Sequence, residues 1–202
     1  SGYKAAPGDP RSTQICIFCH TPHNASPQTP LWNRSDPTVA FGHYSSSSLV
    51  IRKTAAAGYG EPTGSSRLCL SCHDGTVALG MVRSRATPIQ MVGGVTTMPQ
   101  GPANIGTDLS DDHPVSFTYD SGLAAAKGQL RDPLTLTARV RLDHNQQMQC
   151  TSCHDAHDNR WGKFLVQENR ASALCLNCHN PDYWQDSAHR LSNRNWNGAG
   201  ID

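Results

Sequence analysis

The sequence predicts a mostly irregular chain with a few short helices and minimal strand, organised by something other than aliphatic side chains. Only 37% of its 202 residues are hydrophobic, whereas ordinary globular domains reach roughly 45–50%. The chain carries 17 Gly and 13 Pro, which interrupt regular elements. It also carries eight Cys and ten His, which disordered linkers rarely do. Because so few side chains can offset the entropy of folding, the Cys and His residues are the candidates for what organises the core.

The predicted regular elements are short and few. Helical patterns occur in three segments: 122–129, 168–178 and 183–190. Strand patterns occur in two: 89–92 and 115–119. Residues 84–120, rich in Gly, Pro, Thr and Asp, predict a loop-rich connector without sustained periodicity. Loops of this length in a folded domain need an organising group.

All eight cysteines fall into four motifs of the form C-x-x-C-H. The motifs are Cys16/Cys19/His20, Cys69/Cys72/His73, Cys150/Cys153/His154 and Cys175/Cys178/His179. Two thiols at this spacing form thioethers with the two vinyl groups of one haem, and the adjacent histidine ligates its iron. The sequence therefore predicts four covalently attached haem c groups, and a multihaem cytochrome c fold wrapped around a stack of four haems.

Two other uses of the cysteines explain the pattern less well. Disulfides do not require a histidine after every pair. Structural zinc is the better rival, because Cys153 and Cys175 are near zinc-ribbon spacing, but zinc does not need histidine at one fixed offset. Covalent haem attachment takes place outside the cytoplasm. We therefore expect an exported protein, extracellular or at the outer cell surface, with the periplasm as the alternative.

The charge balance limits the expected partners. A formal charge of +1 and a pI near 7.6 provide no basic field for nucleic acid. No apolar run approaches the ~20 residues of a transmembrane segment. The first residues, Ser1-Gly2-Tyr3-Lys4, are typical of a mature, processed N-terminus.

The chain contains an internal duplication. Ser-Arg-Leu-Cys-Leu-Ser-Cys-His at 66–73 is repeated as Ser-Ala-Leu-Cys-Leu-Asn-Cys-His at 172–179. Likewise Cys-Ile-Phe-Cys-His-Thr-Pro-His at 16–23 matches Cys-Thr-Ser-Cys-His-Asp-Ala-His at 150–157. We expect one tetrahaem domain over residues 1–202, with doubled modules at 16–75 and 150–181 joined by the connector 84–120.

Six histidines lie outside the motif positions and are candidates for the second axial position. They are His23, His43, His113, His144, His157 and His189. We expect the iron ligands among His23, His43, His113, His157 and His189, and we expect His144, in a polar run, to be a spectator. Each of these histidines is also compatible with a solvated surface position.

Position in the chain gives some of these candidates a sharper role. His23 and His157 each follow a motif histidine by three residues, a path of at most about 11 Å, too short to round a haem. Each should therefore ligate the iron of a different haem. His113 precedes Pro114 and follows Asp111 and Asp112, whose carboxylates are candidates to orient its ring.

Every motif ends in histidine and two further histidines are spare, so no iron is expected to keep an open site. This pattern favours electron transfer without catalysis over a multihaem reductase. A soluble monomeric periplasmic shuttle is the alternative electron-transfer role. Since haems replace the missing hydrophobic residues, we also predict that the haem-free chain does not fold.

Several strings resemble the doubled-C-x-x-C-H multihaem cytochromes c of metal-reducing bacteria such as Geobacter. They are Cys-Ile-Phe-Cys-His-Thr-Pro-His-Asn-Ala at 16–25, Leu-Trp-Asn at 31–33, Cys-Leu-Ser-Cys-His-Asp-Gly-Thr-Val at 69–77 and Asp-His-Pro-Val-Ser-Phe at 112–117. The resemblance implies a homopolymeric extracellular filament that passes electrons to other redox proteins or to extracellular metal oxides. It further implies that His23 ligates a haem of the adjacent subunit.

Overall fold

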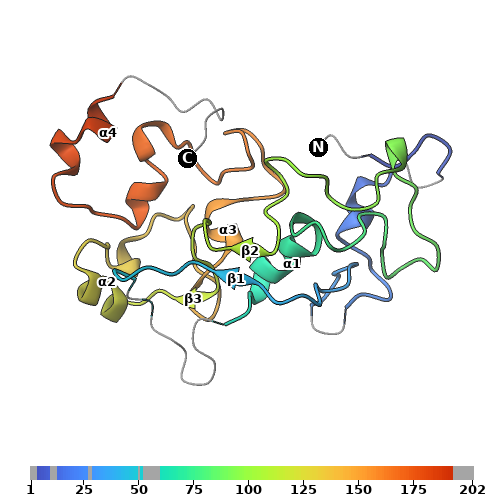
Figure 1. Cartoon of the computed structure of the whole chain (residues 1–202), viewed down its shortest axis with the longest axis horizontal. Helices are drawn as coiled ribbons and strands as arrows, with labels where there is room; N and C mark the ends of the chain where they lie inside the picture. Colours follow the sequence, from blue (N-terminus) through green and yellow to red (C-terminus); the bar gives the residue numbers. More distant parts are fainter. Residues whose placement is uncertain (1–3, 10–12, 27–28, 50, 52–59, 193–202) are drawn as a thin grey trace. The chain divides into compact units, whose positions relative to one another are not determined.

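The computed structural model describes residues 4–9, 13–26, 29–49, 51 and 60–192 and has little regular structure (Figure 1). Its α-helices are α1 (Gly64–His73), α2 (Ser121–Lys127), α3 (Cys150–Cys153) and α4 (Ala188–Leu191). Its 3-10 helices are η1 (Ile15–Phe18), η2 (Val92–Gly94), η3 (Pro133–Thr135), η4 (Arg170–Ser172), η5 (Cys175–Asn177) and η6 (Trp184–Asp186). Its strands are β1 (Gly42–His43), β2 (Asp108–Leu109), β3 (Phe117–Thr118) and β4 (Gln147–Met148). The expectation of a mostly irregular chain with few short helices and minimal strand is confirmed.

The chain divides into two compact units that follow the internal duplication. Unit 1 comprises Ser1–Leu49 and Ala55–Ser116, and it holds the first two C-x-x-C-H motifs. Unit 2 comprises Val50–Thr54 and Phe117–Asp202, and it holds the last two. Each doubled motif therefore has its own local core. In the described part of the chain, no helix combines the length and apolar character needed to cross a bilayer.

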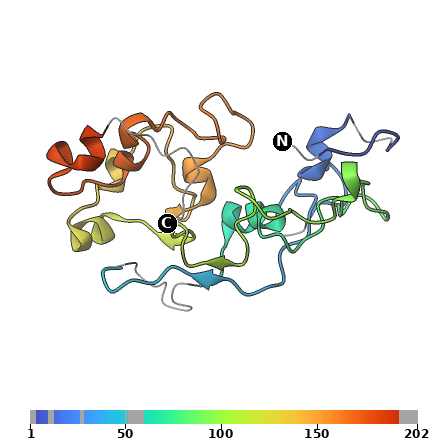
Figure 2. The same cartoon turned by 45° about the horizontal axis from the view of Figure 1, so that its top comes forward.

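A short parallel strand pair in unit 1 packs against the helix of the second motif. Strands β1 and β2 pair Gly42 with Asp108 and His43 with Leu109, and they lie side by side in Figure 2. A Cβ at Gly42 would lie 2.5 Å from Asp108 Oδ1, so a side chain at this position would displace the Asp108 carboxylate. Leu109 and Phe41 bury themselves with Leu70 of α1. The strand pair thus fixes the helix that carries Cys69, Cys72 and His73.

The rest of unit 1 is held by two small clusters. One contains Ala5, Ile17, Val82 and Ile89, and the other contains Leu79, Met91 and Met98. Residues 84–116, within the expected connector, therefore supply core side chains to unit 1. A Cβ at Gly80 would lie 2.0 Å from the Ile89 carbonyl oxygen, so the chain segments cross there at a distance that only glycine allows.

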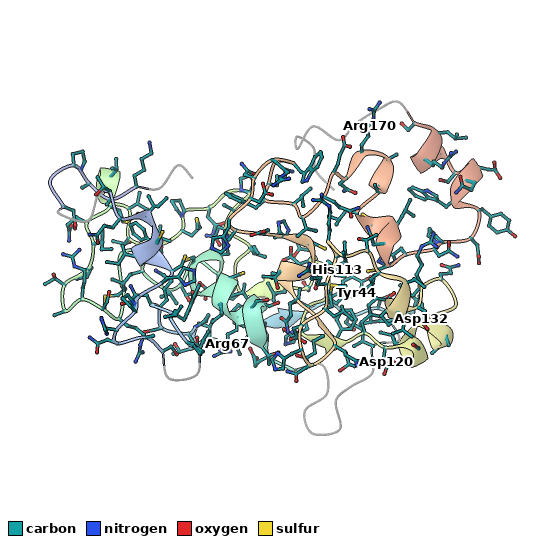
Figure 3. All side chains as sticks on the ribbon, turned by 180° about the vertical axis from the view of Figure 1, so that it is seen from behind. Tyr44, Arg67, His113, Asp120, Asp132 and Arg170 are labelled. Atoms are coloured by element: carbon teal, nitrogen blue, oxygen red, sulfur yellow. The ribbon has the colours of Figure 1, made fainter. Side chains whose placement is uncertain are left out.

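Unit 2 has the largest apolar cluster. Its buried members are Tyr119, Leu123, Ala124, Val140, Met148, Leu174 and Cys178. Strands β3 and β4 pair in antiparallel fashion beside it. Helix α2 is capped by Asp120, whose carboxylate accepts the N–H of Leu123 at 2.7 Å. Asp132 caps η3 in the same way, and both capping residues are labelled in Figure 3.

Two predicted elements are confirmed and three are not. The helix at 122–129 corresponds to α2 and the strand at 115–119 to β3. The helix at 168–178 is wrong: η4 and η5 replace it, because Ala171 and Ser172 adopt left-handed conformations, with φ of 50° and 61°. The helix at 183–190 is divided into η6 and α4 by the extended Ser187. The strand at 89–92 is reduced to one bridge, between Ala5 and Met91, followed by η2.

Candidate haem-binding motifs

The four C-x-x-C-H motifs place their three functional residues on one helical turn. In three motifs the histidine N–H donates to the carbonyl of the first cysteine. These bonds are His20 to Cys16 at 2.8 Å, His154 to Cys150 at 3.0 Å and His179 to Cys175 at 2.9 Å. The second motif forms the last turn of α1. Each motif therefore offers two sulfurs and one imidazole from the same short turn, as covalent attachment of haem c requires.

All eight cysteines are free thiols, and their burial suits an uncharged thioether. Cys16 and Cys175 are exposed, Cys178 is buried, and the others are partly buried. Burial raises the pKa of both Cys153 and Cys178 to about 11. The burial that disfavours a thiolate carries no such penalty for a thioether, which has no ionisable proton.

The two motifs of each unit lie near each other. In unit 1, the pKa of the Cys72 thiol responds to a thiolate charge at Cys19. In unit 2, the pKa of Cys178 responds in the same way to Cys153. Both pairs join a first motif to a second motif across long stretches of chain. The doubled motif of the sequence is therefore also a doubled site in space.

Hydrogen bonds fix the orientation of two motif histidines. His73 Nδ1 lies 2.6 Å from the carbonyl oxygen of Ala103, and His154 Nδ1 lies 2.9 Å from that of Lys163. A carbonyl only accepts, so Nδ1 carries the proton and Nε2 keeps its lone pair. This is the arrangement in which an imidazole ligates a metal through Nε2 while its other nitrogen is held by a neighbour.

A partly buried indole beside the first motif also fits a bound haem. The Trp32 ring contacts the His20 ring edge-on, with centroids 6.0 Å apart and planes at 80°. Trp32 Nε1 is buried and has no hydrogen-bond partner within the described chain. Buried indole N–H groups normally find an acceptor. The propionate carboxylates of a haem attached at Cys16 and Cys19 are suitable acceptors for it.

The distal candidates of unit 1 lie in turns and at a strand end. His23 is exposed, in a tight turn where its N–H donates to Thr21 Oγ1 at 3.3 Å and its carbonyl accepts from the same hydroxyl at 2.7 Å. His43 ends β1 opposite Leu109. His113 is exposed and labelled in Figure 3, and its Nδ1 lies 2.8 Å from the Pro114 carbonyl oxygen. The Pro114 carbonyl is one partner of that ring, and its orientation by Asp111 or Asp112 stays a prediction.

In unit 2, His157 repeats the turn of His23. Its N–H donates to Asp155 Oδ1 at 2.9 Å, and its Nδ1 lies 3.4 Å from the same oxygen. The ring is 80% exposed, and His144 is also exposed. His189 lies on α4, but its side chain falls outside the described part of the structure. The distal roles of His23, His43, His113, His157 and His189 stay predictions.

The two units share a backbone arrangement after their first motifs that the internal duplication of the sequence did not reveal. After the first motif of each unit, the chain leaves in a loop and returns antiparallel to the motif histidine. In unit 1 the returning chain forms the bridge His20–Trp32 and the hydrogen bonds Thr21 N to Leu31 O and Asn33 N to Cys19 O. In unit 2 the matching contacts are the bridge His154–Leu165 and the hydrogen bonds Asp155 N to Phe164 O and Val166 N to Cys153 O. The loops differ in length by one residue, which hides the match in sequence. By this register, Arg34 of unit 1 corresponds to Gln167 of unit 2.

Asn33 and Arg34 are site residues to which the sequence alone assigned no role. Both are fully buried. Asn33 Nδ2 donates to the Ile17 carbonyl inside the first motif at 2.6 Å. Arg34 donates to the Ser71 carbonyl inside the second motif at 2.7 Å. Two consecutive residues therefore hold both motifs of unit 1. The Leu-Trp-Asn string at 31–33 includes Asn33 but gives it no role, and no local pattern distinguishes Arg34 from a surface polar residue.

Comparison with known proteins agrees with this assignment. Residues 144–183, which contain the third and fourth motifs, match the doubled CXXCH motif family. No curated protein matches the chain significantly. Among the described residues, which include all eight cysteines, no three His, Cys, Asp or Glu side chains are grouped so that they could hold a metal ion by themselves. The motifs indicate covalent binding of haem c, and the family match supports a multihaem c-type cytochrome-like protein.

Proposed function

We propose that the protein is an electron-transfer cytochrome with four covalently attached haem c groups, one at each C-x-x-C-H motif. The observation that carries the proposal is the common turn that presents two cysteines and a histidine in all four motifs. The haems supply a reversible one-electron change at iron. The chain supplies the thioether sulfurs, the axial nitrogens and a covering that keeps water away.

We propose two histidine ligands at each iron, and therefore no catalytic site. His20, His73, His154 and His179 each supply one ligand, and the distal candidates supply the other. The bonded Nδ1 atoms of His73, His154 and His113 support ligation through Nε2. With both axial positions filled, no iron is free to bind a substrate, which separates this role from that of a multihaem reductase.

The finer proposal is that the protein is exported and polymerises into an extracellular filament. In this respect it would resemble OmcE, the filament-forming tetrahaem cytochrome, and it would pass electrons to other redox proteins or extracellular metal oxides. The exposure of His23, in a tight turn on Thr21 only three residues after His20, supports this role, because it leaves the side chain accessible to a neighbouring subunit. His23 would then ligate a haem of the adjacent subunit.

The haem count and ligation are tested on the purified holoprotein. Intact mass after denaturation should exceed the chain mass by four haems, and electron paramagnetic resonance should give only low-spin iron. A mass increment of fewer than four haems contradicts the tetrahaem assignment. A high-spin, five-coordinate haem in the native protein contradicts the proposal that no iron has an open site.

The inter-subunit bond is tested by His23→Ala, with His144→Ala as the matched control. Electron microscopy of the wild type and of the control should show filaments, whereas His23→Ala should give none. One haem per subunit should also lose its low-spin signal in His23→Ala. Filaments with intact low-spin spectra in His23→Ala would exclude the inter-subunit bond. A wild type that stays monomeric would instead favour the soluble periplasmic shuttle.

A further inference from the structure

Arg34 is a buried cation without a carboxylate partner among the described residues. Its exposed fraction is 0%, and its contacts are backbone carbonyls and one serine hydroxyl. The guanidinium donates to Ser71 O, Ala78 O, Leu79 O, Met81 O and Ser71 Oγ. These bonds occupy Nε and both terminal nitrogens, so no donor is left for a haem propionate. Arg34 is therefore placed to act on a haem through its field and not by direct pairing.

The charge lies between the two haem-binding motifs of unit 1. Arg34 is bonded to Ser71, which immediately precedes Cys72 of the second motif. The neighbouring Asn33 donates its backbone N–H to the Cys19 carbonyl of the first motif at 2.9 Å. Consistent with this position, Arg34 lowers the pKa of the Cys19 and Cys72 thiols, against the larger effect of their burial. A haem joined to either cysteine would lie in the same field.

Unit 2 has no equivalent buried cation among its described residues. Gln167 occupies the corresponding position, and its amide donates to the Ala173 carbonyl at 3.0 Å. Arg131 does reach the fourth motif, where Nε donates to the Leu176 carbonyl at 2.9 Å, but Arg131 is exposed. Water and salt screen an exposed charge far more than a buried one. The two units therefore share a scaffold and differ in one buried charge.

We propose that Arg34 raises the reduction potentials of the unit 1 haems above those of the unit 2 haems. The inference rests on the proposed haem binding. A reduced haem carries one positive charge fewer than an oxidised haem, so a nearby fixed cation favours reduction; no bond or proton changes. In a partly reduced protein at equilibrium, the unit 1 haems would then be reduced more often than the unit 2 haems.

One buried carboxylate in unit 1 opposes this effect. Asp74, 3% exposed, accepts from Thr76 N at 2.9 Å and Thr76 Oγ1 at 2.6 Å, and it raises the pKa of Cys72. Asp74 directly follows His73 of the second motif, whereas Asn33, the neighbour of Arg34, is bonded to the first motif. The largest rise in potential is therefore expected at the haem of the first motif.

The test is a spectroelectrochemical titration of the holoprotein, with Arg34→Gln as the main variant. This substitution places glutamine at position 34, the residue that unit 2 has at the corresponding position 167. Coulomb's law for a unit charge at about 10 Å and an effective dielectric near 20 gives roughly a tenfold change in the ratio of reduced to oxidised haem. This corresponds to about 59 mV for a one-electron couple. Arg34→Gln should lower the unit 1 potentials by this order and leave the unit 2 potentials unchanged.

Arg83→Gln is the matched control, because it removes an exposed arginine from the same unit. Its shift should be small and should vanish in high salt, whereas the Arg34→Gln shift should persist. Loaded Arg34→Gln protein with wild-type potentials, or with a shift no larger than that of Arg83→Gln, would overturn the proposal.

A second test does not depend on the folding of Arg34→Gln. Cysteine-to-alanine removal of one motif at a time assigns each potential to its haem, and the two highest should belong to the motifs at 16–20 and 69–73. The opposite order would refute the inference while leaving haem binding intact. A protein that carries no haem would instead refute the proposed function.

Discussion

Removing one hydroxyl from the core of unit 2 should loosen that unit alone. Tyr119 is 2% exposed and packs in the largest apolar cluster. Its hydroxyl donates to the Arg131 carbonyl and lies 3.3 Å from the Cys178 carbonyl of the fourth motif. Burial raises the pKa of Tyr119, so the hydroxyl stays a donor at neutral pH. Tyr119→Phe keeps the ring and removes only this donor.

The expected loss of stability in Tyr119→Phe depends on which backbone carbonyl loses its hydrogen-bond donor. Cys178 O keeps the N–H of Arg131 at 2.7 Å, but Arg131 O loses the hydroxyl. One lost buried hydrogen bond costs about 1–2 kcal/mol. Amides of the unit 2 core should therefore exchange hydrogen about 5- to 30-fold faster, because opening becomes easier by that factor.

Hydrogen exchange of the holoprotein, followed by mass spectrometry of its peptides, checks this prediction. Tyr183→Phe is the control, since Tyr183 is 88% exposed and its loss should change exchange by less than threefold. Peptides of unit 1 should be unaffected by either variant. Equal exchange in Tyr119→Phe and wild type, or an equal effect of Tyr183→Phe, would refute the role assigned to this hydroxyl.

Three further predictions concern stability and the haem-free chain. Gly80→Ala should lower the denaturation midpoint by the equivalent of about 1–3 kcal/mol, because its Cβ would lie 2.0 Å from the Ile89 carbonyl oxygen; an unchanged midpoint would contradict this. Gln149→Ala should cost about 1 kcal/mol in guanidinium unfolding, because Gln149 is buried and forms the capping box of α3. In the haem-free chain, alkylation should reveal thiols of ordinary pKa throughout. If that chain folded, burial would raise the pKa of Cys153 and Cys178 to about 11, and both thiols would resist alkylation below that pH. The neutral thiols would then contribute stability below about pH 9, and this contribution would be lost as the pH rises toward 11.

Elements with local signals could be predicted from the sequence. Helix α2 has an aspartate cap at Asp120, an alanine-rich interior and Gly128 in the left-handed conformation at its end. Each signal acts within a few residues, so no distant contact is needed to define the helix. The four haem motifs are local in the same sense, because three residues of one turn carry their chemistry.

Elements that depend on distant contacts could not be predicted. Helix α1 contains few apolar residues, and Leu70 gains its burial from Phe41 and Leu109, each more than 25 residues away. The reverse holds for 168–178, where a helical pattern is interrupted at Ala171 and Ser172. Its second part instead places Cys178 in the cluster around Tyr119.

The same limit applies to the site. Arginine is usually found at protein surfaces, and the acceptors of Arg34 lie 37 to 47 residues further along the chain. Only the fold can reveal that such a side chain is buried. The motif cysteines needed no such information, because their spacing defines their chemistry.

A charge difference between duplicated units matters because electron transfer is sensitive to free energy at each haem. Four haems with the same ligands and the same surroundings would share an electron equally. The scaffold repeated after Cys19 and Cys153 would by itself produce such equality. By the proposal above, a buried arginine in place of a neutral glutamine at one of two equivalent positions would change this equilibrium without changing the turn that holds the motif. A duplicated module can in this way keep its geometry for haem attachment and still acquire a preferred location for the electron.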